Sequence, residues 1–443
     1  MSAASVRASV AVIGGGWAGC TAAVELAHAG CKVTLYEAAR SLGGRARSVE
    51  VHGKLLDNGQ HIMLGAYADT LRLLRRVGIK PADALLHLPL QMRYPPGSGM
   101  DFVAPRLPAP LHLAIALLRA KGLAREDKMA LARFSTSARW MDWTLYNDCS
   151  VIELLERFDQ TPRLTALMWR PLCLAALNTP PERASAQVFL NVLRDSLGAH
   201  RAASDMLVPR LALSALFPAA AAQYIESRGG HVRIGARVES LQAVGGQWQV
   251  RSGAGAQDVD AVIIATPPPA AASLLEGLGA PPIPSFDYEP ITTCYLQYDP
   301  ALRLDLPFYA LEEHPESGEW GQFVFDRGQL DAHQAGLMAV VISASGQAND
   351  LAQDALGAAV AQQLGRALGR PGFAEPLWTK VITEKRATFA CTPGLVRPGI
   401  DTGLPGLCLA GDYTAGDYPA TLEGAVRSGT AAARAVLQRT AIP

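Results

Sequence analysis

The N-terminal part of the chain contains the feature that most restricts its fold. The uncharged run 9–13 predicts a buried strand, and the glycine-rich stretch 14–19 (Gly-Gly-Gly-Trp-Ala-Gly) follows it directly. A helix with apolar residues at helical spacing should then extend to Gly30, and 31–36 predicts a second strand that ends at Glu37. This order of strand, glycine turn, helix, strand and acid predicts a parallel βαβ unit that binds a dinucleotide.

Each residue type in this unit has a physical role. Gly14 permits the tight turn, Gly16 lets the backbone approach a pyrophosphate, and Gly19 lets the helix pack closely on the strand. The helix N-terminus offers unpaired N–H groups and partial positive charge to phosphates. Glu37 lies where a carboxylate accepts hydrogen bonds from ribose hydroxyls. We expect the cofactor contacts of this unit at Gly14, Gly16, Trp17, Ala18, Gly19 and Glu37.

A second glycine turn lies shortly beyond the ribose acid, at Gly43, Gly44 and Arg45. It resembles the second fingerprint of the flavin amine oxidase and phytoene desaturase family, in which this turn runs along the FAD pyrophosphate. A simple nicotinamide-binding domain has no such segment. The resemblance therefore implies that the dinucleotide is FAD, with backbone approach at the two glycines and a cation from Arg45.

More distant segments extend the resemblance along the chain. Residues 232–234 and 237–239 look like two strands that pair with each other, and Val238 matches the family residue whose backbone contacts adenine. Residues 261–265 predict a buried strand that ends at Thr266, as in the strand beneath the adenosine half.

The C-terminal part carries the last family motif. A short strand should end at Gly411 and Asp412, the pair that binds pyrophosphate or ribityl in the family. The final helix should begin near 421, and the resemblance implies that its N-terminus, with Gly424 and Ala425, faces the flavin carbonyl edge.

These motifs predict an α/β protein with two domains. A discontinuous Rossmann-type FAD-binding domain, glutathione-reductase-like, should comprise residues 5–90, 201–283 and 376–443. A second, α+β domain for the substrate should comprise 91–200 and 284–375.

The two insertions have different patterns. Residues 129–145 and 151–158 carry apolar side chains at helical spacing. The second insertion predicts strands at 292–298 and 338–343, and a helix around 351–368.

Composition excludes several classes of protein. With 40 basic and 40 acidic side chains there is no basic excess, which argues against a nucleic-acid partner. The seven cysteines are widely spaced and form no Cys-x-x-Cys pair, so we expect reduced, buried thiols in a cytoplasmic protein and no metal site. The N-terminus does not read as a signal peptide, and no run of about 20 apolar residues would span a bilayer.

One segment nevertheless points to a membrane surface. Residues 111–118 are apolar except for His112, and from 106 to 133 six cations stand against two acids. An apolar segment flanked by cations predicts peripheral contact with the anionic cytoplasmic face of the inner membrane. The alternative is an ordinary buried helix with a solvated tail. The cations are Arg106, Arg119, Lys121, Arg125, Lys128 and Arg133.

Three segments, 57–61, 384–389 and 417–420, resemble one branch of the family, the hydroxysqualene dehydroxylases. This resemblance implies reductive removal of an allylic hydroxyl from a C30 isoprenoid, giving squalene for bacterial hopanoids, with the upstream synthases as partners. A carotenoid (phytoene-type) desaturase is the first alternative, and an amine or protoporphyrinogen oxidase the second. A flavin-bearing subunit of a synthase complex, without activity of its own, is the third.

The same three segments carry the candidate catalytic residues. His61, Asp417 and Tyr418 are candidate proton donors to the leaving hydroxyl, because the family motifs that carry them lie beside the flavin. Lys385 is a candidate flavin contact, and Gln60 a further cofactor contact. Each of the first four also has a structural alternative. His61 would be a hydrogen-bonded core residue, Asp417 a loop cap, Tyr418 a pocket wall and Lys385 a solvated charge on a strand.

Overall fold

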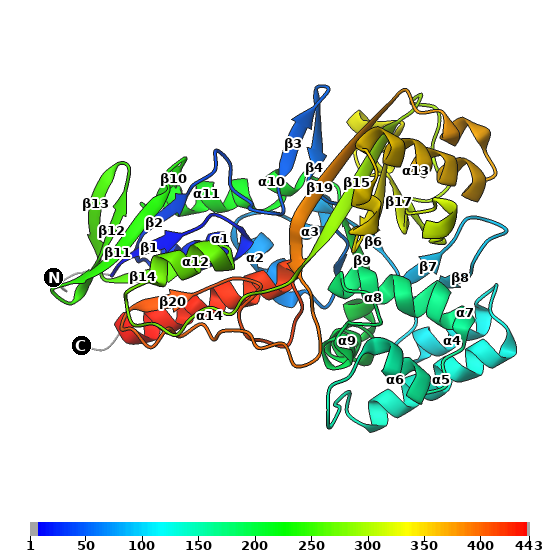
Figure 1. Cartoon of the computed structure of the whole chain (residues 1–443), viewed down its shortest axis with the longest axis horizontal. Coiled ribbons are helices and arrows are strands. Elements are labelled where there is room, and N and C mark those ends of the chain that lie inside the picture. Colours follow the sequence, from blue (N-terminus) through cyan, green and yellow to red (C-terminus); the bar gives the residue numbers. More distant parts are fainter. Residues whose placement is uncertain (1–7, 441–443) are drawn as a thin grey trace.

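The computed structural model describes residues 8–440, and a layered α/β region occupies one end of it (Figure 1). Five parallel strands form its central sheet in the order β10-β2-β1-β14-β20. The order is non-sequential because helices and insertions connect the strands. The strands are β1 (Ser9–Ile13), β2 (Lys32–Glu37), β10 (His231–Ile234), β14 (Ala261–Ile264) and β20 (Leu407–Leu409).

Both faces of the parallel sheet are covered, which explains why its strands are apolar without alternation. Along β1, Val10 and Val12 belong to one apolar core, and Ala11 and Ile13 belong to another. The first face packs against α1 (Trp17–His28), α11 (Pro218–Ser227) and α14 (Leu422–Thr440). The second packs against α12 (Pro268–Leu275) and an antiparallel sheet of β11 (Val238–Val244), β12 (Gln247–Ser252) and β13 (Gly255–Val259).

The expected pairing of 232–234 with 237–239 is wrong. β10 pairs in parallel with β2, with Val232 opposite Leu35, and β11 pairs with β12. The two segments adjoin in sequence, but the turn at Gly235 has a positive φ and separates them into different sheets. A short loop between two β-rich runs therefore joins two layers here.

The second region has a five-stranded antiparallel sheet in the order β16-β17-β18-β15-β19. Helix α13 (Gln353–Ala367) packs on one face of it. The predicted strands and the predicted helix of this insertion are confirmed. The strands are β15 (Tyr288–Gln297), β16 (Phe308–Ala310), β17 (Phe323–Asp326), β18 (Leu337–Ser343) and β19 (Trp378–Phe389).

The other insertion is mainly helical, as predicted, and shares its apolar core with the other face of this sheet. Ser150 caps α6 by accepting a hydrogen bond from the Glu153 N–H, so that helix begins where the sequence places it. A π-helical turn, η2 (Arg194–Gly198), ends the last helix. The helices are α4 (Leu111–Arg119), α5 (Arg125–Trp140), α6 (Val151–Arg157), α7 (Pro162–Leu164), α8 (Arg170–Leu177) and α9 (Ala186–Leu193).

Smaller elements connect the regions. Strands β5 (Met63–Leu64), β6 (Leu85–Leu88) and β9 (Met206–Pro209) form a small sheet, and β7 (Gln91–Arg93) and β8 (Asp101–Val103) form a two-stranded sheet. Strands β3 (Ser48–Val51) and β4 (Lys54–Asp57) form a hairpin, and α2 (Ala68–Arg76), α3 (Pro81–Ala84) and α10 (Leu213–Leu216) complete the set.

The domain limits remain a prediction, and the pairing of β19 (Trp378–Phe389) differs from the predicted limit at 376. Strand β19 pairs with β15 from Trp378 to Phe389, so its hydrogen bonds belong to the second sheet. The predicted limit at 376 places this strand in the FAD-binding part instead. A long β-rich segment reads alike in either domain, and only its partner strand decides.

Candidate active site

The glycine turn after β1 has the geometry that its sequence predicts. Gly14 has φ +108°, and a Cβ there would lie 2.5 Å from the Ala265 carbonyl oxygen. A Cβ on Gly19 would lie 1.8 Å from the Gly14 carbonyl oxygen. Trp17 and Ala18 are buried in the first turn of α1, whose N-cap residue offers no side-chain hydrogen bond. The N–H groups of this helix end are therefore open to an anion.

Glu37 is held at the end of β2 beside the same turn. One of its carboxylate oxygens accepts a hydrogen bond from the Gly15 N–H at 2.7 Å, and the other from the Ala39 N–H at 2.7 Å. The Gly43 N–H donates to the Gly15 carbonyl oxygen, so the second glycine turn lies directly against the first. The predicted ribose acid and both glycine turns thus form one cradle.

An ion pair joins two predicted cofactor residues that are far apart in sequence. An Arg45 Nη lies 2.6 Å from an Asp412 carboxylate oxygen. Arg45 also donates to the Ala387 carbonyl oxygen at 2.7 Å. This contact arises from a bulge in β19, where the register with β15 shifts between Glu289 and Ile291. The bulge brings the second sheet against the cofactor cradle.

Polar atoms without partners mark the space that a bound dinucleotide would fill. Seven side-chain polar atoms within residues 8–440 are buried with no hydrogen-bond partner, and two of them, Thr266 Oγ1 and the Tyr413 hydroxyl, lie directly beside predicted cofactor segments. A Cβ added to Gly16 meets nothing within 4 Å, although Trp17 beside it is buried. Buried polar atoms without partners are uncommon in proteins, and a ligand commonly satisfies them. These residues fit a dinucleotide that passes Gly16 and Thr266.

The remaining predicted cofactor residues lie near this space or close behind it. Gly424 stands at the start of α14, where a Cβ would lie 2.9 Å from the Pro419 carbonyl oxygen, and the Ala425 N–H donates to the Thr421 carbonyl oxygen. The Gly411 N–H donates to Ser428 Oγ at 2.8 Å. Val238 is buried at the start of β11.

The side chain of Gln60 has a different role from the one expected. Its Nε2 donates to the Tyr295 hydroxyl at 2.8 Å, and its Oε1 accepts from Arg327 at 2.9 Å. The amide group therefore binds residues of the second region, and its contact with the cofactor stays a prediction. Arg327 is buried and lies 3.9 Å from the Asp57 carboxylate. These contacts fix segment 57–61 to the second sheet.

His61 is the histidine of that segment. Burial lowers its pKa from the usual 6.5 to about 4, so the imidazole is neutral at physiological pH. Burial removes water that would stabilise the charged imidazolium, so the neutral imidazole is favoured. A neutral imidazole can still donate or accept one hydrogen bond at each nitrogen, according to its tautomer.

Tyr418 occupies a buried position in front of α14. Its hydroxyl donates to an Asp195 carboxylate oxygen at 2.8 Å, and the Arg427 guanidinium lies 4.1 Å from its ring centroid. The Tyr67 ring meets it edge-on. Burial raises the pKa of Tyr418, and the hydrogen bond with Asp195 adds to this effect, so the phenol keeps its proton. Gly424, close by, would place a Cβ 3.6 Å from the Tyr418 Cβ.

Two other catalytic candidates are not buried. Asp417 is exposed, so burial does not support it as the proton donor. Only its carbonyl oxygen is bound, by Asn191 at 3.2 Å. Lys385 is also exposed, in the bulge of β19, so its predicted flavin contact finds no support in burial. Neighbouring Arg386 lies over the Tyr288 ring instead.

Sequence reasoning missed three residues that hold the candidate side chains. Asp195, Arg327 and Tyr295 lie in the insertions, far in sequence from the motifs that they contact. Asp195 is turned toward Tyr418 from the π-helical turn η2, a geometry that is frequent at functional sites. No local pattern in the sequence marks any of the three.

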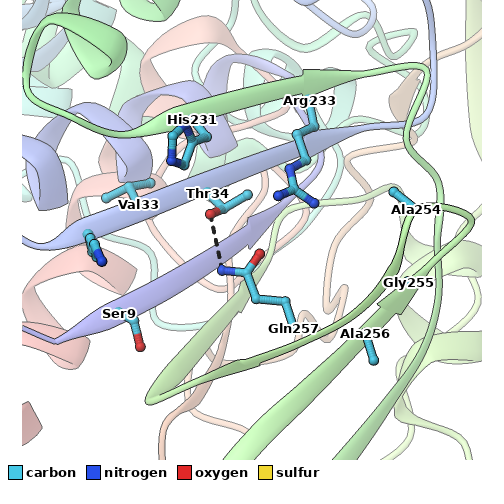
Figure 2. Close-up of a pocket in the computed structure, with 10 residues that line it drawn as sticks. Ser9, Val33, Thr34, His231, Arg233, Ala254, Gly255, Ala256 and Gln257 are labelled. Carbon is cyan, nitrogen blue, oxygen red and sulfur yellow. Dashed lines mark hydrogen bonds between the residues drawn. The ribbon is translucent and has the colours of Figure 1, made fainter.

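A separate groove of about 350 Å³ lies on the parallel sheet away from the predicted site residues (Figure 2). It is lined by polar side chains, among them Thr34, His231 and Arg233, and Gln257 donates to the Thr34 hydroxyl. None of the predicted site residues lines it. The groove therefore does not belong to the candidate active site.

Comparison with known proteins identifies the family of this chain. The family model of flavin-containing amine oxidoreductases matches residues 17–437. The chain belongs to this family. It is an FAD-dependent oxidoreductase, and the prediction of FAD is confirmed.

Two relatives and one solved structure show how far the similarity extends. The hydroxysqualene dehydroxylase of Rhodopseudomonas palustris is 31% identical over 97% of this chain and 98% of the relative. The 15-cis-phytoene desaturase of Glycine max is 24% identical over 97% of this chain and 79% of the relative. A redesigned putrescine oxidase has the same fold, with a TM-score of 0.68 at 17% identity over 98% of this chain and 99% of that one.

The described residues lack two further features. No helix among them is both long and apolar enough to cross a membrane. Within residues 8–440, no group of three or more histidine, cysteine or carboxylate side chains is arranged to hold a metal ion.

Proposed function

We propose that this enzyme converts hydroxysqualene into squalene by reductive removal of the hydroxyl group, as a step in bacterial hopanoid synthesis. The observation that carries the proposal is the full-length similarity to a hydroxysqualene dehydroxylase, at 31% identity. The desaturase similarity is lower, at 24% identity, and covers less of that relative. A C30 hydrocarbon substrate also places the enzyme at the cytoplasmic face of the membrane, close to the synthases that supply it.

The reaction breaks one C–O bond and forms one C–H bond. The hydroxyl takes a proton and leaves as water, and the carbon that it leaves becomes an allylic cation. The two glycine turns and Asp412 would hold FAD, which in its reduced form would provide a hydride for this carbon. The protein must deliver a proton, exclude water from the cation and hold the hydrocarbon by van der Waals contact.

Tyr418 is the side chain that we assign to proton delivery. Its raised pKa keeps the phenol protonated throughout the physiological range. Asp195 and Arg427 fix its position, from the hydroxyl and from the ring face respectively. Neutral His61 acts as a hydrogen-bonding wall rather than as an acid, because its pKa lies at about 4.

The aromatic side chains near the Asp412 loop exclude water. Tyr413 is buried and contacts the Phe286 ring, which in turn contacts Phe389. These rings form a low-dielectric wall, and a cation in such a place is short of water that could capture it.

A single-turnover experiment tests the proposal. The holoenzyme is reduced chemically without oxygen, mixed with hydroxysqualene in detergent, and its products are analysed by mass spectrometry. We expect one squalene per FAD and the return of the oxidised flavin spectrum. Phytoene given to the oxidised enzyme serves as the comparison: a conjugated product there, with no squalene in the first assay, would favour the desaturase.

A further inference from the structure

Helix α4 exposes leucines to solvent and buries a histidine, the reverse of an ordinary surface helix. Its buried positions are His112 and Ala116, whereas Leu111, Ala114 and Leu118 are exposed. Leu111 is 56% exposed and Leu118 is 71% exposed. These three residues follow one another at helical spacing, so they form one apolar stripe that faces away from the protein. Water on that side of the helix would normally be met by polar side chains.

Helix α5 adds a second stripe with a different composition. Its exposed residues at helical spacing are Arg125, Met129, Arg133, Thr136 and Trp140. Trp140 is 90% exposed, and Tyr146, shortly after the helix, is fully exposed. This stripe therefore combines two cations with a large apolar side chain and an aromatic one. Trp and Tyr are enriched where a protein meets the boundary between lipid headgroups and acyl chains.

The large exposed apolar side chains of the protein are concentrated in this segment. Of the thirteen within the described residues, six lie between 107 and 146. Isolated exposed apolar residues are normal, but their concentration on two helices in contact with each other, α4 and α5, and on the residues beside them points to an interaction surface. We call these residues the α4–α5 surface: Leu107, Leu111, Leu118, Met129, Trp140 and Tyr146.

Charge indicates what covers this surface. From Arg106 to Arg139 there are seven cations and two acids, and one of the acids, Asp127, is buried. In the described part of the chain, Arg119, Lys121, Arg125 and Arg133 have no carboxylate within ion-pair distance. Unpaired cations around an apolar stripe complement a surface that is anionic outside and apolar beneath. A second protein chain would have to supply both properties at once.

His112 supports the view that α4 is fixed to the protein by its back face. This histidine is 1% exposed, and its Nε2 lies 3.4 Å from Ser204 Oγ. Turning the leucines of α4 inward would break this contact. Figure 1 shows α4 and α5 at the end of the molecule far from the parallel sheet.

We propose that the α4–α5 surface is a docking face for an anionic lipid bilayer, with the leucine stripe and Trp140 inserted among the headgroups. The inference rests on the proposed function in one respect, since the bilayer is where a C30 hydrocarbon dissolves. Docking by this face sets the helical region against the lipid and leaves the FAD cradle away from it.

Sedimentation of the holoenzyme with vesicles tests the docking face. Vesicles of phosphatidylcholine alone are compared with vesicles of phosphatidylcholine and phosphatidylglycerol in equal parts. We expect binding to the anionic vesicles, weakened by salt. Leu118→Ser and Trp140→Ser should each lower vesicle affinity about fivefold or more, because each removes a buried apolar contact. Leu377→Ser is the matched control, since Leu377 is 72% exposed but lies outside this surface.

The cations are tested by a second pair of variants. Arg125→Gln combined with Arg133→Gln should lower the affinity for anionic vesicles by about tenfold to thirtyfold. Arg237→Gln combined with Arg251→Gln removes two exposed cations elsewhere and should change it little. Equal effects of both pairs would mean that net charge alone, and not this face, attracts the enzyme to lipid.

Three outcomes would overturn the inference: no binding of the wild type to anionic vesicles, no difference between Leu118→Ser and Leu377→Ser, or a surface that joins two copies of the chain. Sedimentation velocity without lipid detects the last, as a wild-type oligomer that Leu118→Ser dissociates. Each variant is also assayed for single-turnover squalene formation in detergent. Vesicle binding without squalene would contradict the proposed function alone, and squalene without vesicle binding would contradict the docking face alone.

Discussion

At the residue scale, the glycines of the first turn matter for the room that a missing side chain leaves as much as for backbone flexibility. Gly14 needs its positive φ, whereas Gly16 and Gly19 have ordinary backbones and differ in what surrounds them. Gly19 is pressed against the Gly14 carbonyl oxygen, and Gly16 faces open space. The packing of the protein therefore requires Gly19, whereas we predict that only the cofactor requires Gly16.

This difference gives a paired prediction. Gly19→Ala should destabilise the protein by about 3 kcal/mol, because its Cβ cannot avoid the Gly14 oxygen without a backbone shift. Gly16→Ala should unfold like the wild type without added FAD, yet bind FAD at least about tenfold more weakly, because its methyl group occupies the pyrophosphate space. Urea unfolding and flavin absorbance measure the two effects. Tight FAD binding by Gly16→Ala would contradict the placement of the cofactor.

His61 gives a prediction for pH. The unfolded chain binds a proton at this residue below about pH 6.5, whereas the folded protein does so only near pH 4. The free energy of unfolding should therefore fall by roughly 2 kcal/mol as pH decreases from 6.5 to 4, and stay unaffected by His61 above pH 7. His61→Asn should flatten this part of the curve. An equally steep decline in that variant would show that other groups cause it.

At the element scale, irregular pieces of secondary structure connect the two regions. The bulge in β19 reaches Arg45, and the π-helical turn η2 presents Asp195 to Tyr418. Regular helices and strands form the cores, and these irregular turns place the candidate side chains.

The contact from η2 predicts two unequal effects on turnover. Tyr418→Phe should lower the single-turnover rate by about a hundredfold, the lower range for loss of a proton donor, with the flavin spectrum unchanged. Asp195→Asn keeps a hydrogen-bond acceptor for Tyr418 and should lower the rate less and shift its pH dependence. Stopped-flow flavin reoxidation with hydroxysqualene measures both. A Tyr418→Phe rate equal to the wild type would return Tyr418 to the role of a pocket wall.

At the scale of the whole molecule, the cofactor cradle is assembled from segments that lie far apart in the chain. The glycine turns come from the first 45 residues, Thr266 from the middle, and Asp412 from near the end. We predict that FAD touches all of them, and its binding energy would then add to the stability of the complete arrangement.

Removal of FAD should therefore destabilise the whole fold. At a free FAD concentration of 100 times its Kd, the free energy of unfolding should exceed that of the apoprotein by about 2.7 kcal/mol. Thermal unfolding over a series of FAD concentrations measures this. Asp412→Asn, which weakens the pair with Arg45, should need more FAD for the same gain. A wild-type unfolding temperature that does not change with FAD concentration would contradict a cradle that spans the chain.

The sequence by itself determined the parts that depend on local spacing. The strand, glycine turn, helix and acid from 9 to 37 appear where predicted, because the burial of a parallel strand and the backbone geometry of the glycines depend on residues that are consecutive in sequence. The main strands and the helix of the second insertion follow in the same way. The prediction of FAD came instead from the resemblance of the motifs to the family.

Only the tertiary structure decided which side chains meet and which meet water. Residues 231–239 divide between two sheets, Gln60 turns to Arg327, and Asp417 lies in solvent, all through contacts with distant segments. An apolar helix such as α4 has the same sequence pattern whether its leucines are buried or exposed. Its orientation depends on what packs behind it, and here that partner is Ser204, which holds His112 on the inner side.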